Sequence, residues 1–283
     1  MTPPEILRLA AFTNRPDGGN PAGVVLDATG LSDAQMQAIA ADVGYSETAF
    51  VTRARGPREL DVRYFSPIAE VPFCGHATIA TGVALADRDG AGEFVLHTPA
   101  GVVPVATTTD GEGRTTATLT SVAPHVLELD DADLDAALAL LGWTRDDLDP
   151  ALPPRIGFAG ARHLVLAAAT RARLADLDYD FGGLKTYMLE RDLTTVDLVW
   201  REDATTFHAR NPFPVGGVVE DPATGAAAAA LGAYLRELGL VTPPVRLTVH
   251  QGDELGRPSV LLVDVDPTPA GIRVTGGAVP IGA

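Results

Sequence analysis

The chain has 283 residues, of which 46% are hydrophobic and 20% are charged. This length is sufficient for one large domain or two of ordinary size, and the composition excludes wholesale disorder. The formal net charge of −16 argues against nucleic acids and anionic membranes as partners, because both bind basic surfaces.

A single cysteine, Cys74, excludes an intrachain disulfide framework and any metal site built from several cysteines. The first residues contain neither the positive nor the apolar region of a signal peptide. No apolar run reaches the roughly 18 residues that span a bilayer. We therefore expect a cytoplasmic protein.

The first part of the chain is predicted to consist mainly of strands with one early helix. The helix covers residues 31–44, where Ser32 and Gln35 match a capping box and Gly44 supplies the left-handed position that ends a helix. Apolar or alternating runs bounded by turn residues predict strands at residues 6–12, 22–26, 48–52, 60–65, 94–98, 101–106 and 115–120.

An acid-rich stretch, residues 128–149, holds eight acids against one base, Arg145. It could be a cation site, but acids in a first helical turn are also typical of a solvated helix. We predict the helix, capped by Asp130 or Asp131 and ended by Gly142. Further strands are predicted near residues 156, 163–168, 196–201, 245–250 and 260–265, and many short strands with few helices indicate an α+β fold.

Two predicted helices, residues 77–86 and 226–235, are small and apolar around their whole circumference. Such a helix is typically buried on all sides, as a helix wrapped by strands would be. Each begins at a glycine beside polar residues, so backbone N–H groups face those residues. This pattern predicts two equivalent domains whose helix starts face each other across a cleft that holds one site.

Ionisable and polar residues stand beside these helices. Cys74 and His76 precede the first, and Asp221 and Thr224 precede the second. Each residue has an alternative structural explanation. Asp221 could cap the following helix, and Cys74 could be a small buried hydrophobic residue. Glu47 is either exposed on a turn or desolvated, and in the second case its raised pKa would make it a general acid/base.

The chain resembles the phenazine-biosynthesis PhzF family in six motifs that occur in order from about residue 6 onward. The motifs are Gly19-Asn20-Pro21-Ala22-Gly23-Val24, Tyr45-Ser46-Glu47-Thr48-Ala49-Phe50, Arg63-Tyr64-Phe65-Ser66-Pro67, Cys74-Gly75-His76-Ala77-Thr78, Glu220-Asp221-Pro222-Ala223-Thr224-Gly225, and Gln251-Gly252 followed by Gly256-Arg257-Pro258-Ser259.

This resemblance implies a diaminopimelate-epimerase-like fold, with two domains that each wrap a barrel-like sheet around a central helix. The implied domains are residues 1–122, completed by a strand at 270–283, and residues 123–269. It also implies a homodimer and an isomerase without metal or cofactor, in which a glutamate moves a proton on a small carboxylate-bearing substrate.

Carried over residue by residue, Glu47 is the acid/base, and His76 and Asp221 are its polar partners in catalysis. The resemblance assigns substrate binding to Asn20, Ser46, Cys74, Gly75, Thr224, Gly225 and Ala226. Backbone N–H groups near Gly75 and Gly225 would hold the substrate carboxylate, as helix N-termini can.

Two departures leave other functions open. Ala226 stands where the phenazine enzyme has a serine, and Thr224 stands where related epimerases have a second cysteine. The alternatives are a Cys74-dependent epimerase or dehydratase of an amino or imino acid, and a catalytically silent small-molecule-binding protein. No metal is expected, because His76 lacks partners at ligand spacing along the chain.

Overall fold

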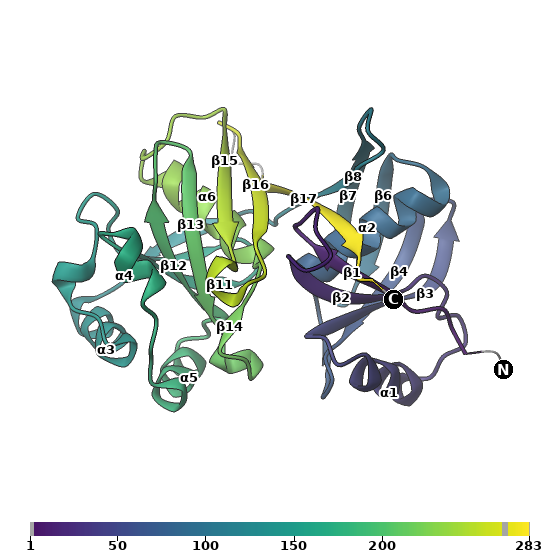
Figure 1. Ribbon diagram of the computed structural model, residues 1–283, viewed down its shortest axis with the longest axis horizontal. Coiled ribbons are helices and arrows are strands. Elements are labelled where there is room, and N and C mark those ends of the chain that lie inside the picture. The colour runs from purple at the N-terminus through teal and green to yellow at the C-terminus, as the bar shows by residue number, and fades with distance from the viewer. Residues whose placement is uncertain (1–2, 268–270, 283) are drawn as a thin grey trace. The chain divides into compact units, whose positions relative to one another are not determined.

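The computed structural model describes residues 3–267 and 271–282, and the chain divides into two compact units (Figure 1). Unit 1 comprises Met1–Thr120 and Thr275–Ala283, and unit 2 comprises Ser121–Val274. The boundary predicted between residues 269 and 270 lies outside the described residues. None of the helices in the described ranges is both long enough and apolar enough to cross a bilayer.

Within its described residues, unit 1 is a closed barrel of eight strands. Around the barrel these are β1 (Leu7–Ala11), β2 (Asn20–Val25), β3 (Glu47–Gly56), β4 (Glu59–Phe65), β6 (Glu93–Thr98), β7 (Gly101–Thr109), β8 (Thr115–Thr120) and β17 (Arg273–Pro280). Strand β17 closes the ring by pairing with both β1 and β8. The pairs β2–β3 and β4–β6 are parallel, and the short strand β5 (Glu70–Val71) pairs antiparallel with β4.

Helix α2 (Gly75–Asp89) lies inside this barrel and contacts β1, β2, β3, β7 and β8. Every residue from His76 to Ala86 is buried, so the helix has no solvent-facing side over that length. Its small side chains permit this, because a Cβ added at Gly82 would lie 2.8 Å from Val105 Cγ1 and 3.0 Å from Ala117 Cβ. Helix α1 (Asp33–Val43) packs Met36 against an outer apolar cluster of the barrel.

Unit 2 is built on the same plan. Its described residues form a run of paired strands, β9 (His125–Glu128), β10 (Arg155–Phe158), β11 (Arg162–Ala167), β12 (Thr195–Arg201), β13 (Thr206–Pro212), β15 (Val245–Gln251) and β16 (Ser259–Val265). Helix α6 (Gly225–Glu237) is buried along most of its length and contacts β9, β10, β11, β12 and β16. Helices α3 (Asp131–Leu141) and α5 (Phe181–Glu190) pack on β11 and β12, and α4 (Arg171–Ala175) contacts β12 and β13.

The order of connections repeats between the units. A parallel strand pair (β2–β3 and β11–β12) is followed by an antiparallel partner (β4 and β13), then by a two-residue strand (β5 and β14, Glu220–Asp221) and a buried helix (α2 and α6). The strand after each helix then pairs parallel to β4 or β13. This repeat makes Cys74 and Thr224 equivalent, since each immediately precedes its buried helix.

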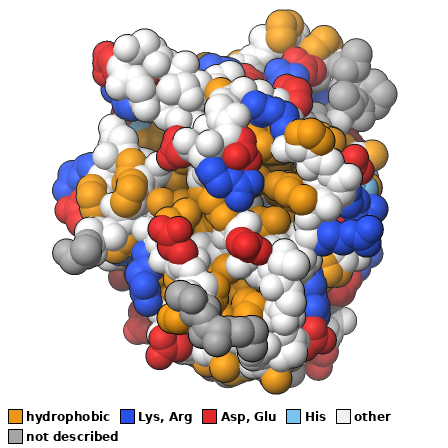
Figure 2. Space-filling model, turned by 90° about the vertical axis from the view of Figure 1, so that its right-hand side faces the viewer, with side chains coloured by type: hydrophobic (Ala, Val, Ile, Leu, Met, Phe, Trp, Pro, Cys, Tyr) orange, Lys and Arg blue, Asp and Glu red, His pale blue; other side chains and the backbone are white. Residues whose placement is uncertain are grey.

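The structure confirms the α+β class and places a helix or strand at every predicted element. In the acid-rich stretch it confirms the helix, with Asp130 as the cap and Gly142 in the left-handed conformation. The acids there pair with a base, because Arg145 lies 2.9 Å from Asp131 and 2.7 Å from Asp135. On the face shown in Figure 2, acidic and basic side chains are likewise interspersed.

A buried polar chain crosses three strands of unit 2. His163 Nδ1 lies 2.8 Å from Thr195 Oγ1, which donates to Asn211 Oδ1 at 2.6 Å, and Asn211 Nδ2 donates to Asp197 Oδ1 at 3.1 Å. Because the Thr195 hydroxyl donates to Asn211, it can only accept from His163, which therefore carries its proton on Nδ1. All four side chains are almost completely buried.

Burial sets the charge of the two ionisable members of this chain. It lowers the pKa of His163 to about 3 and raises the pKa of Asp197 to about 7, against the opposing hydrogen bond from Asn211. Both residues are therefore neutral in the folded protein across the mildly acidic range, whereas in the unfolded chain both are charged there.

The close packing of α2 leads to a first prediction. In an ordinary helix, Gly→Ala stabilises by up to about 1 kcal/mol, but overpacking a core costs about 1–3 kcal/mol. We expect Gly82→Ala to lower the free energy of unfolding by about 1–2 kcal/mol in urea titrations. Gly182, exposed in α5 with its nearest neighbour at 3.7 Å, is the control, and Gly182→Ala should be neutral or stabilising. Equal stabilisation by both substitutions would contradict the packing argument.

The second prediction concerns the pH dependence of stability. Between about pH 4 and pH 6.5 the folded pair binds one proton, on Asp197, and the unfolded pair also binds one, on His163, so their contributions cancel. In His163→Gln, the remaining Asp197 binds its proton only in the folded state, so stability should fall as pH rises, relative to wild type. In Asp197→Asn, stability should instead rise with pH. Each slope should approach about 1.4 kcal/mol per pH unit in urea unfolding, and slopes parallel to wild type would contradict the assignment.

Candidate active site

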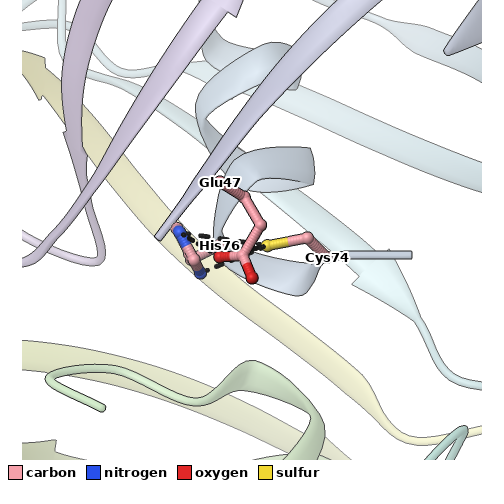
Figure 3. A group of neighbouring side chains, drawn as sticks. All are labelled: Glu47, Cys74 and His76. Atoms are coloured by element: carbon pink, nitrogen blue, oxygen red, sulfur yellow. Dashed lines mark hydrogen bonds and ion pairs between the residues drawn. The ribbon is translucent and has the colours of Figure 1, made fainter. Parts of the chain in front are cut away.

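The first group of predicted site residues gathers at the start of α2. Cys74 immediately precedes the helix and His76 is its second residue, while Glu47 is the first residue of β3, which contacts the helix. The three side chains point toward one another (Figure 3). A carboxylate, a thiol and an imidazole thus come together from segments that are 27 residues apart in the sequence.

The contacts within this group are polar and fairly long. Cys74 Sγ lies 3.5 Å from Glu47 Oε2 and 3.3 Å from His76 Nδ1. His76 Nε2 lies 3.5 Å from Glu47 Oε2 and 3.4 Å from Ser46 Oγ. The imidazole therefore bridges the thiol on one side and the carboxylate and hydroxyl on the other, an arrangement in which protons can pass between neighbouring groups.

The sequence allows Glu47 to be either exposed or desolvated, and the structure shows that it is desolvated. Its side chain is only 15% exposed, which excludes the alternative of an exposed turn residue. Burial raises the pKa of Glu47, and hydrogen bonds from Ser46 and Cys74 partly oppose that rise. A carboxyl group with a raised pKa exchanges protons closer to neutral pH, as a general acid/base must.

Two other predicted residues belong to the same part of unit 1. Asn20 begins β2 and is buried. Its strand neighbour Ala22 is in register with Glu47, so alternation along β2 places Asn20 on the same barrel face as Glu47. Gly75 is the first residue of α2, and the N-cap residue Cys74 makes no side-chain capping bond.

The second group lies at the start of α6 in unit 2. Thr224 immediately precedes the helix, and Gly225 and Ala226 are its first two residues. The Thr224 hydroxyl donates to Asp221 Oδ2 at 2.6 Å, so Asp221 accepts a hydrogen bond from the residue that begins the helix. The N-cap residue of α6 is thus Thr224 rather than Asp221, and the Thr224 side chain makes no capping bond to the helix.

Gln251 holds this second group in place. Its Nε2 donates to Asp221 O at 2.7 Å and to Thr224 Oγ1 at 3.1 Å, and its Oε1 accepts from Thr224 N at 3.1 Å. Because the Thr224 hydroxyl accepts from Gln251, its own proton is directed to Asp221. In the sequence, Gln251 is only one residue of a motif. Its role in holding Asp221 and Thr224 becomes evident from its buried position at the end of β15.

The two groups differ in what their equivalent positions can do. Glu47 and Thr195 each begin the second strand of the parallel pair, in register with Ala22 and His163 respectively. Cys74 corresponds to Thr224, and His76 to Ala226. Unit 1 therefore presents three ionisable side chains where unit 2 presents two hydroxyls and a methyl group, none of which titrates near neutral pH.

The first group also has the composition of a metal site. Ligating atoms of Glu47, Cys74 and His76 all lie within 4.8 Å of one another, and no other such group of three occurs in residues 3–267 and 271–282. Spacing along the sequence gives His76 no ligand partner besides Cys74, and it is the fold that brings Glu47 to them. The expectation that no metal is needed for activity stays a prediction.

Comparison with known proteins finds relatives along most of the chain. The chain is 29% identical over 288 residues to "Uncharacterized isomerase YfhB" of Bacillus subtilis (strain 168), covering 99% of this chain and 97% of that protein. It is 31% identical over 254 residues to a trans-2,3-dihydro-3-hydroxyanthranilate isomerase of Pseudomonas chlororaphis, covering 89% and 86%.

Solved structures show the same fold. A Bacillus anthracis phenazine biosynthesis protein of the PhzF family matches with a TM-score of 0.86 and 27% identity, covering 100% of this chain and 98% of that one. A hydroxyproline epimerase from Agrobacterium vitis matches with a TM-score of 0.65 at 14% identity, covering 98% and 90%, which shows a shared diaminopimelate-epimerase-like fold. The family described as phenazine biosynthesis-like protein matches residues 9–282, and the chain belongs to that family.

Proposed function

We propose that this protein is an isomerase that moves a proton between carbons of a small carboxylate-bearing substrate, with Glu47 as the acid/base. The observation that carries the proposal is that ionisable side chains occupy the repeated positions in unit 1 but not in unit 2. Glu47, Cys74 and His76 cluster in unit 1, and their equivalents Thr195, Thr224 and Ala226 cannot exchange protons. One group that takes a proton and returns it elsewhere is sufficient for an isomerisation.

In this mechanism the Glu47 carboxylate accepts a proton from one carbon of the substrate and, as a carboxylic acid, returns it to another. The raised pKa of Glu47 supports both halves of the transfer near neutral pH. His76 Nε2, 3.5 Å from the carboxylate, can stabilise its ionised form or the charge that develops on the substrate. No metal or cofactor is required for such a transfer.

For the substrate carboxylate we propose the helix starts at Gly75 and Gly225. The first N–H groups of an α-helix have no intrahelical partner and carry the positive end of its dipole. Neither N-cap residue, Cys74 or Thr224, makes a side-chain capping bond, so each start is suited to an anion. The named Pseudomonas relative acts on a hydroxyanthranilate, which is a ring carboxylate, and we propose this class rather than that compound, because Ala226 provides no hydroxyl.

A second candidate function rests on the thiol. Cys74 Sγ lies 3.3 Å from His76 Nδ1, the separation at which an imidazole can take a thiol proton. Cys74 would then be the base of an epimerase or dehydratase of an amino or imino acid, with Glu47 in a supporting role. A single pair of substitutions separates the two functions.

We expect Glu47→Gln to reduce turnover by about 100-fold or more, because the amide keeps the shape and removes the ionisable group. Cys74→Ala should reduce it much less. The assay follows deuterium incorporation from deuterated solvent into a panel of cyclic and amino carboxylates by NMR, with ligand binding measured in parallel. Binding should persist in Glu47→Gln. Loss of turnover in Cys74→Ala alone would replace the first function by the second.

We expect Gln251→Leu to raise KM by about tenfold with a smaller change in kcat, because it releases the Asp221–Thr224 pair without touching Glu47. Gln37→Leu is the matched control, since Gln37, on α1, makes a comparable 2.8 Å bond to Ser66 O and is a member of neither group. Thermal unfolding of both variants separates a loss of folding from a loss of positioning. An unchanged KM in folded Gln251→Leu would contradict a substrate-binding role for this group.

A further inference from the structure

We propose that Glu47, Cys74 and His76 form a binding site for one thiophilic divalent cation of the zinc class. The three residues supply a carboxylate oxygen, a sulfur and an imidazole nitrogen, which are the three ligand types that zinc takes in proteins. Two ligands come from one helix start with a single residue between them, and the third comes from β3.

The spacing of these atoms differs from that of hydrogen-bonded pairs elsewhere in the protein. His97 Nε2 lies 2.7 Å from Glu59 Oε1, and His208 Nε2 lies 2.7 Å from Glu202 Oε2, as expected for direct hydrogen bonds. His76 Nε2 stays 3.5 Å from Glu47 Oε2. The imidazole and the carboxylate at the start of α2 therefore lie near each other, but farther apart than a direct hydrogen bond would hold them.

Two of the three separations match the edges of a tetrahedral metal site, and the third is slightly longer. With zinc–ligand bonds of about 2.0–2.3 Å and tetrahedral angles, neighbouring ligand atoms lie about 3.3–3.8 Å apart. Cys74 Sγ is 3.5 Å from Glu47 Oε2 and 3.9 Å from His76 Nε2, and the third edge is 3.5 Å. Small side-chain rotations are sufficient to place one cation at bonding distance from all three atoms.

Burial and access also suit a cation with one exchangeable position. Cys74 and His76 are 8% and 6% exposed, so two ligands are shielded from water, whereas Glu47 is 15% exposed. Three protein ligands leave a fourth tetrahedral position for water or a substrate carboxylate, as in zinc sites that exchange a ligand. On binding, the Cys74 thiol loses its proton to solvent and the thiolate bonds the metal.

The consequence for activity rests on the proposed function. A bound cation occupies the Glu47 oxygen and the Cys74 sulfur together, so neither can take a proton from a substrate. The cation is therefore an inhibitor of the metal-free enzyme rather than its cofactor.

The test uses Co²⁺ as a spectroscopic probe on the full chain after treatment with a chelator. We expect one Co²⁺ per chain, with a near-ultraviolet thiolate-to-cobalt charge-transfer band, visible bands of tetrahedral cobalt, and displacement of Co²⁺ by one equivalent of Zn²⁺. Cys74→Ser should abolish the charge-transfer band. Glu47→Gln should keep that band but weaken binding by at least about tenfold.

The surface pair His97 and Glu59 provides the control, because His97→Gln removes an imidazole–carboxylate contact remote from any thiol and should leave Co²⁺ binding unchanged. Circular dichroism confirms that each variant is folded. Absence of the charge-transfer band in the folded wild type, or equal affinity in folded Cys74→Ser, would overturn the site.

Measurements of activity distinguish the metal site from the proposed role of Glu47. With the substrate found in the deuterium assay, Zn²⁺ should inhibit the wild type and a chelator should restore its activity. If Co²⁺ binds as predicted and turnover continues with Zn²⁺ bound, the metal site stands and the role of Glu47 as acid/base is wrong. If Glu47→Gln abolishes turnover and no cation binds, the reverse holds.

Discussion

A helix fits inside an eight-stranded barrel only if it has small residues where the strands approach it most closely. In unit 1 this constraint determines where α2 can carry larger polar side chains. At Gly82 even an added Cβ would lie within 3.0 Å of Val105 and Ala117. The thiol and imidazole of this helix lie at its start, where Cys74 and His76 meet the first residue of β3. Glu47 is desolvated there because the barrel that encloses α2 also encloses its carboxylate.

The second unit shows the same architecture, but the positions of Glu47, Cys74 and His76 carry residues that do not ionise near neutral pH. At the position of Glu47 it has Thr195, which belongs to a buried chain of hydrogen bonds with His163, Asn211 and Asp197. That chain is neutral at mildly acidic pH because burial makes both of its charged forms costly. Asn211 is in register with Asp221 on β14, so the neutral chain supports the strand that carries the polar group of this unit. The repeat thus combines one helix start that carries ionisable side chains with one whose equivalent positions carry none.

Sequence patterns predicted the elements whose signals are local. The capping box at Ser32, the glycine ends of α1 and α3 and the two small-residue helices are examples. Strand β13 was not predicted, because Thr206–Pro212 mixes histidine, arginine and asparagine with few apolar residues, and its burial depends on partners from distant parts of the chain. The desolvation of Glu47 and the positions of Gln251 and Asn211 were unpredictable for the same reason, since each results from contacts across strands.

The strand that closes the unit 1 barrel, β17, follows the whole of unit 2 in the sequence. While the chain emerges from the ribosome, β1 and β8 are both available before their common partner has been made. Until then each has an unpaired edge, the kind of surface that adds strands from other chains. Unit 2 must therefore be synthesised, and has time to fold, while the unit that carries Glu47 is still an open sheet. The barrel around Glu47, Cys74 and His76 is completed last, and premature termination leaves an aggregation-prone edge.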